Sequence, residues 1–203
     1  MSFKTKGYNI QKNIIGKEIT DFLYSYLQLK HKVFNTLCDM NLISPYNTDW
    51  GAKRDGFVSD TFTLYADTTF DNLITFLKKK VEKETKLKLI ESYSYVRLYK
   101  KGDELHKHTD RNGCTVSLTL NLGGDKWPIF LIDKKGIETD ITLSPGDAVL
   151  YQGRDLPHWR KKFKGIICGQ VFLHYTLPDA KILYDTRKHI GLPNSASLRG
   201  EKN

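Results

Sequence analysis

The stretch YVRLYKKGDELHKHTD, residues 95–110, decides how the rest of the sequence is interpreted. It begins as a strand-like run rich in Tyr and Val, turns at Lys101-Gly102-Asp103, and ends on His108 and Asp110. In a strand, residues i and i+2 point to the same side, so this imidazole and this carboxylate are expected to face one space. A second histidine, His158, follows in DLPHWR, shortly after the apolar segment DAVLYQG.

Two imidazoles and one carboxylate on one side of a metal leave three adjacent positions of an octahedral ion open. That is the ligand set of the non-haem Fe(II) oxygenases. An HxD pair alone is weak evidence, since ordinary surface residues supply many. Here a strand leads into the pair and a Pro-Gly-Asp turn with an apolar strand leads to the second histidine. We therefore predict that His108, Asp110 and His158 are the catalytic metal ligands.

The sequence around these residues is rich in short strand-like segments separated by turns that contain Gly. They cover residues 93–99, 114–122, 128–133, 137–143, 147–151 and 166–175. Such spacing predicts a sandwich or jelly roll. Earlier in the chain, apolar residues recur every three to four positions over 17–39 and 70–84, which predicts two helices. The expected fold is α+β, mainly β, with the helices packed on one side of the jelly roll.

Length and composition indicate the number of domains and how the chain is divided. A chain of 203 residues with 39% hydrophobic residues is expected to form one domain over 1–203. We expect a helical part over about 1–88, a core over about 90–177 and a tail over 178–203, weakly ordered from about Gly191. The irregular segment 40–68 is expected to be a lid or binding element, or to carry short strands.

Three cysteines cannot pair fully, which argues against a disulfide framework and favours a reducing, cytoplasmic compartment. The sequence shows no signal peptide and no apolar run long enough to span a membrane. The net charge of +9 is spread thinly along the chain. A basic protein can meet nucleic acid or an anionic small molecule, and no nucleic-acid motif accompanies this charge.

The sequence over about 90–177 resembles the 2-oxoglutarate- and Fe(II)-dependent dioxygenases, most closely the branch similar to prolyl 4-hydroxylases. The matching pieces occur in family order: YVRLYKKGDELHKHTD, VSLTLNL, the Gly123-Gly124 turn, LSPGDAVLYQG and PHW. The resemblance implies a double-stranded β-helix (jelly-roll) core opening onto an iron held by His108, Asp110 and His158. It also implies 2-oxoglutarate and O2 as cosubstrates, and ascorbate is a further candidate cofactor.

The resemblance places Tyr99 where such hydroxylases use a tyrosine that hydrogen-bonds 2-oxoglutarate. The sequence departs from the family pattern on the last core strand, where Cys168 replaces the usual base. A buried carboxylate still needs a cation, and an arginine fork suits it best. The nearest bases are Arg160, Lys162, Lys164 and Arg97. Arg160 shares the face of His158 if that segment is extended, so it is the first candidate. Arg97, two residues before Tyr99, is the second.

Other residues near these motifs have simpler interpretations. His106 is expected at the rim of the site, and His174 in the core. Arg111 is expected to point away from Asp110 in a regular strand, and it is also a candidate for binding substrate or pairing with an acid near the mouth of the site. Trp127 and Trp159 are expected to pack or to line the cavity.

The expected function is hydroxylation of an organic substrate by an Fe(II)- and 2-oxoglutarate-dependent enzyme. The substrate implied by the resemblance is a prolyl residue in a peptide or protein, and a small metabolite is equally compatible. Two further alternatives stay open: a nucleic-acid dioxygenase, and a non-catalytic, cupin-like metal-binding module. The sequence leaves the oligomeric state open.

Overall fold

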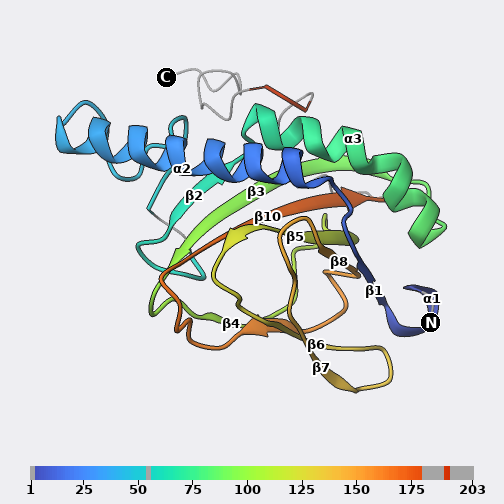
Figure 1. Cartoon of the computed structure of the whole chain (residues 1–203). Helices are drawn as coiled ribbons and strands as arrows, with labels where there is room; N and C mark the ends of the chain where they lie inside the picture. The colour runs from blue at the N-terminus through green and yellow to red at the C-terminus, as the bar shows by residue number, and fades with distance from the viewer. Residues whose placement is uncertain (1–2, 54–55, 180–189, 193–203) are drawn as a thin grey trace.

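A computed structural model describes residues 3–53, 56–179 and 190–192 of the chain. Two antiparallel sheets face each other, and two long helices lie on the outer side of the larger sheet (Figure 1). The six-stranded sheet has the order β1 (Tyr8–Gln11), β8 (Ala148–Tyr151), β5 (Val116–Gly124), β10 (Ile167–Thr176), β3 (Ile90–Lys100) and β2 (Phe62–Tyr65). The four-stranded sheet has the order β4 (Leu105–His108), β9 (His158–Arg160), β6 (Ile129–Ile132) and β7 (Glu138–Ile141).

The two faces of the six-stranded sheet have different chemistry because successive side chains alternate. On β10, Val171 and Leu173 join the large apolar cluster under the helices. The alternate residues of the same strand, Gln170, Phe172 and His174, are also buried. They face the four-stranded sheet, and this more polar interior is the space in which the site lies.

The helices cover the apolar face. Helix α2 (Lys17–Asp39) buries Leu23, Leu27 and Phe34, and helix α3 (Thr68–Thr85) buries one side along its whole length. Asp67 caps α3, because its carboxylate accepts a 3.0 Å hydrogen bond from the backbone N–H of Thr69. A four-residue helix, α1 (Phe3–Lys6), precedes β1.

The predicted fold class is confirmed: two facing antiparallel sheets form a jelly roll with helices on one side. Both predicted helices are present, and α3 begins two residues earlier than expected. Strand β1 and helix α1 were not predicted. The short strands β4 and β9 lie in segments for which the sequence analysis assumed strand geometry without assigning bounds. Segment 40–68 carries β2 near its end. Most of the predicted tail lies outside the described residues.

Candidate metal centre and its cavity

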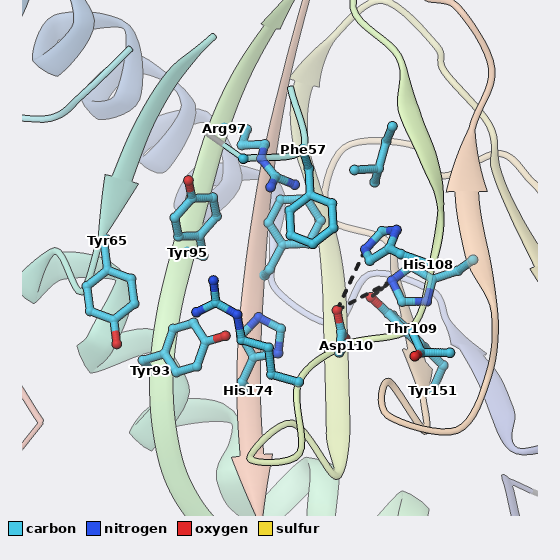
Figure 2. Close-up of a pocket in the computed structure, with 15 residues that line it drawn as sticks. Phe57, Tyr65, Tyr93, Tyr95, Arg97, His108, Thr109, Asp110, Tyr151 and His174 are labelled. Carbon is cyan, nitrogen blue, oxygen red and sulfur yellow. Dashed lines mark hydrogen bonds and ion pairs between the residues drawn. The ribbon is translucent and has the colours of Figure 1, made fainter. Parts of the chain in front are cut away.

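The three predicted ligands come together at the edge of the four-stranded sheet. Strands β4 and β9 pair antiparallel, with His108 directly opposite His158. Asp110 lies two residues beyond β4, where its N–H donates a 2.8 Å hydrogen bond to the carbonyl of Gly153. Asp110 Oδ1 lies 3.5 Å from His158 Nε2 and 3.9 Å from His108 Nε2. Figure 2 shows His108 and Asp110 facing each other across this space.

The hydrogen bonds of the two histidines fix which ring nitrogen is available. Nδ1 of His108 lies 2.8 Å from the carbonyl oxygen of His106, and Nδ1 of His158 lies 2.9 Å from that of Leu156. A carbonyl only accepts, so both Nδ1 atoms carry a proton, and the Nε2 atoms, which face Asp110, are the ones that a metal ion would bind. Metal-bound histidines in proteins are oriented in this way.

The electrostatics of the cluster also favour a cation. Burial alone would raise the pKa of Asp110, but hydrogen bonding to His158, the nearby imidazoles and the Ser117 hydroxyl together hold it well below its usual range. Burial and the neighbouring His158 lower the pKa of His108. The cluster therefore offers an ionised carboxylate and neutral imidazole at neutral pH. One donor atom from each residue lies within 4.8 Å of the others, so the residues fit one divalent metal ion.

A cavity of about 260 Å³ opens beside these residues. Its opposite wall is aromatic, with Tyr65, Tyr93 and Tyr95 on neighbouring strands (Figure 2). The Tyr65 and Tyr93 rings are stacked with centroids 5.0 Å apart. Phe57, from the long segment before β2, closes one side of the cavity, and the centroids of its ring and the His108 ring are 4.7 Å apart.

The three expected cosubstrate residues lie between the two sheets. Tyr99 is fully buried, and its hydroxyl accepts a 3.2 Å hydrogen bond from Arg97 Nη1. Arg97 lines the cavity, and its guanidinium lies 4.9 Å from the centre of the Tyr95 ring. Arg160 is 1% exposed and donates hydrogen bonds to the Trp127 carbonyl and the Gln170 side chain. As predicted, Arg160 and His158 point to the same, inner side of β9.

The remaining residues are placed as follows. His106 is exposed and is not among the residues that line the cavity. Arg111 lines the cavity, because strand β4 ends before Asp110 and the regular alternation does not continue. Trp127 packs against Tyr99, while Trp159 stacks on Phe130, away from the cavity.

The sequence analysis did not identify a role at the site for Ser117, Gly153 or His174. Ser117 donates a 2.6 Å hydrogen bond to Asp110 Oδ2, and His174 lies 3.0 Å from the same serine hydroxyl. His174 is buried as expected, but it also lines the cavity. A Cβ atom on Gly153 would collide with Asp110 and Ser117. An alternating strand pattern over 114–122 places Ser117 on the inner face, but it gives no signal for the partner.

Comparisons by sequence find no matching family model and no matching curated protein. Comparison of the structure finds clear similarities. A Pseudomonas putida prolyl-4-hydroxylase is 16% identical with a TM-score of 0.65, over 86% of this chain and 95% of that one. HygX from Streptomyces hygroscopicus, solved with nickel and 2-oxoglutarate bound, is 14% identical with a TM-score of 0.64, over 98% of this chain and 91% of that one. SnoN, an α-ketoglutarate-dependent epimerase from nogalamycin biosynthesis, is 10% identical with a TM-score of 0.64, over 97% and 91%.

These similarities show that the chain has the double-stranded β-helix fold of the 2-oxoglutarate-dependent oxygenases. The resemblance stated from the sequence is thereby confirmed at the level of fold. Within the part of the chain that the structure describes, no helix is long and apolar enough to cross a membrane.

Proposed function

We propose that the protein is an Fe(II)- and 2-oxoglutarate-dependent dioxygenase that hydroxylates an organic substrate. The observation that carries this proposal is the convergence of His108, Asp110 and His158, with both Nε2 atoms facing one carboxylate oxygen. These residues would hold the metal, which supplies the oxidative chemistry with 2-oxoglutarate and O2 when bound. The protein residues orient the ligands, enclose the reacting groups and keep water out.

Two features of Arg160 support a binding site for 2-oxoglutarate between the sheets. Arg160 is a buried cation, and no carboxylate of the described residues forms an ion pair with it. Its Nε also has no hydrogen-bond partner there. Uncompensated buried charge is costly, so an anionic ligand fits this position. We propose that Arg160 binds the distal carboxylate and that the Tyr99 hydroxyl also contacts the cosubstrate. Arg97, which lines the cavity, is the rival cation.

The volume and the lining of the cavity favour a compact substrate group. A volume of about 260 Å³ beside the metal ligands accommodates a side chain or small molecule better than a bulky surface. The aromatic wall of Tyr65, Tyr93 and Tyr95 suits the apolar face of a ring. We propose a prolyl residue in a peptide or protein as the first substrate to test, with small cyclic metabolites beside it. A reducing, cytoplasmic setting is part of the proposal, since all three cysteines are free thiols.

The decisive experiment measures succinate formed from 2-oxoglutarate, first without and then with candidate substrates. We expect turnover that requires both Fe(II) and O2. His108→Ala and Asp110→Ala should abolish it while circular dichroism shows an intact fold. His106→Ala is the matched control, because this exposed histidine stands in the same HKHTD stretch and its activity should be unchanged.

The outcomes separate the alternatives. Metal binding without any succinate would indicate a cupin-like binding module and overturn the proposal. Succinate formation stimulated by proline-containing peptides would support the prolyl substrate, and stimulation by small molecules alone would exclude it. Oligonucleotide binding that falls steeply with salt, together with succinate formation, would instead favour a nucleic-acid substrate.

A further inference from the structure

The two oxygens of the Asp110 carboxylate have different surroundings. Oδ1 faces the Nε2 atoms of His108 and His158, at 3.9 and 3.5 Å. Oδ2 is turned away from that space and accepts a 2.6 Å hydrogen bond from Ser117 Oγ. The carboxylate therefore presents one oxygen to the ligand cluster and has the other occupied by the protein.

The Ser117 hydroxyl is itself held by His174. Nδ1 of His174 lies 3.0 Å from Ser117 Oγ. A serine hydroxyl has a single proton, and here that proton points to Asp110, so the histidine must be the donor in the second bond. The hydrogen bonds then run in one direction, from His174 through Ser117 to Asp110 Oδ2. The imidazole is fixed in turn by packing against Tyr93, with ring centroids 4.6 Å apart.

Gly153 leaves the room that this arrangement needs. A Cβ atom at this position would overlap both Asp110 Oδ2 and Ser117 Oγ. The carbonyl of Gly153 also accepts the N–H of Asp110, which holds the backbone of that residue in place. The turn after β8 and strand β5 thus meet at Asp110 Oδ2, and strand β10 supports this contact through the Ser117 hydroxyl.

We propose that Ser117 and His174 are positioning residues that restrict Asp110 to binding the metal through Oδ1 alone. A carboxylate free to rotate can bind a metal through both oxygens and take a position that cosubstrate or O2 requires. Hydrogen-bond partners of metal ligands elsewhere contribute about 10–100-fold to metal affinity or activity. This inference rests on the proposed function for the identity of the metal site, but its test needs no turnover.

The test titrates the 203-residue protein with Mn(II) and, separately, records the absorption spectrum of the Co(II)-loaded form. We expect Ser117→Ala to weaken Mn(II) binding roughly tenfold or more and to alter the Co(II) spectrum. His174→Phe, which removes the donor, should weaken binding in the same direction by a smaller factor. His174→Asn keeps an N–H donor near the position of Nδ1 and should restore most of the affinity.

A matched control separates positioning from general damage to the fold. Ser92 is also a buried serine in the same sheet, on β3, and its hydroxyl has no hydrogen-bond partner among the described residues. Ser92→Ala should leave Mn(II) affinity unchanged. The melting temperature of each metal-free variant, measured with a chelator, reports any purely structural effect.

Each outcome decides the proposal. It is wrong if Ser117→Ala binds Mn(II) like the wild type, or if Ser92→Ala loses as much affinity. If Ser117→Ala does not fold, the pair His174→Phe and His174→Asn decides, and equal affinities for these two would overturn it. If the wild-type protein binds no Mn(II), the proposed function itself fails, which is distinguishable from a failure of the positioning residues alone.

Discussion

Arg160 is a charged side chain in the interior of the protein, with few groups to balance it. It is 1% exposed, lies beside the Trp127 ring and donates to one carbonyl and one amide oxygen. Burial lowers the pKa of its guanidinium, although an arginine stays protonated under any ordinary condition. An anionic ligand bound beside it would balance this buried charge.

We predict that Arg160→Ala raises the KM for 2-oxoglutarate at least tenfold, about 1.4 kcal/mol of lost binding. Mn(II) affinity should change little, because His108, Asp110 and His158 remain. Steady-state succinate formation at varied 2-oxoglutarate measures the first effect, and Mn(II) titration measures the second. Lys162→Ala is the control, since Lys162 is an exposed base of the same segment.

A KM that is unchanged in Arg160→Ala but raised in Arg97→Ala would assign the carboxylate to the other arginine. Arg97 lines the cavity and donates to Tyr99, so its removal is expected to act more weakly, through the orientation of that hydroxyl. If neither substitution changes the KM, neither arginine binds the distal carboxylate of 2-oxoglutarate.

At the residue scale, only part of the candidate site could be predicted from the sequence. The i, i+2 rule correctly places Arg160 beside His158 on the inner face of β9. It also brings His108 and Asp110 together, although Asp110 lies just past the end of β4. Ser117 and Gly153 could not be found in this way. Their roles depend on contacts among segments far apart in the sequence, and no local pattern records such contacts.

At the scale of elements, the strands that carry the ligands are the shortest. β4 has four residues and β9 has three, too few for alternation to be visible in the sequence. Their direct pairing, with His108 opposite His158, sets the spacing between the two imidazoles. The long strands β3, β5 and β10 were predictable because their runs of β-branched and aromatic residues are long enough to be distinctive.

Asp67 connects two of the predicted elements. Its carboxylate caps α3 and also accepts a 2.8 Å hydrogen bond from the hydroxyl of Tyr26 on α2. The same carboxylate lies 3.5 Å from Lys30 Nζ. We predict that Asp67→Ala lowers the free energy of unfolding by about 1–2 kcal/mol, because it removes both hydrogen bonds and this ion pair. Urea unfolding of the metal-free protein measures this change.

Asp49→Ala serves as the control for this prediction, since Asp49 is exposed in the long segment before β2. Its unfolding free energy should match the wild type within about 0.5 kcal/mol. Equal stability of Asp67→Ala and Asp49→Ala would show that the cap contributes nothing measurable.

At the scale of the whole molecule, the six-stranded sheet separates the apolar cluster that stabilises the fold from the interior that holds the candidate site. Its outer face packs on α2 and α3 through a continuous apolar cluster (Figure 1). Its inner face buries polar groups, among them Ser117, Gln170 and His174. The apolar outer face stabilises the fold, so the inner face can carry groups that are costly to bury. This cost makes the stability of the metal-free protein depend on pH.

We expect His174 to account for much of the change in unfolding free energy between pH 7.5 and pH 5. Burial lowers its pKa to about 4, from an ordinary 6.5; Asp110 acts in the opposite direction, and His158, Arg97 and Arg111 add to the lowering. Below pH 6.5 the unfolded chain binds a proton that the folded protein resists until about pH 4, so stability falls as the pH falls through this window. From pH 7.5 to pH 5 this residue should cost about 2 kcal/mol of unfolding free energy.

The measurement is urea unfolding of the chelator-treated protein at pH 7.5 and pH 5, for the wild type and for His174→Gln. Glutamine does not titrate, so the variant should lose about 2 kcal/mol less than the wild type over the same interval. Contributions from other histidines are common to both proteins and cancel in the comparison. Asp110 does not interfere, because its carboxyl, held well below its usual pKa, stays ionised in the folded protein throughout this range. Equal losses in the two proteins would show that the folded state accommodates a protonated His174, contrary to its burial between the sheets.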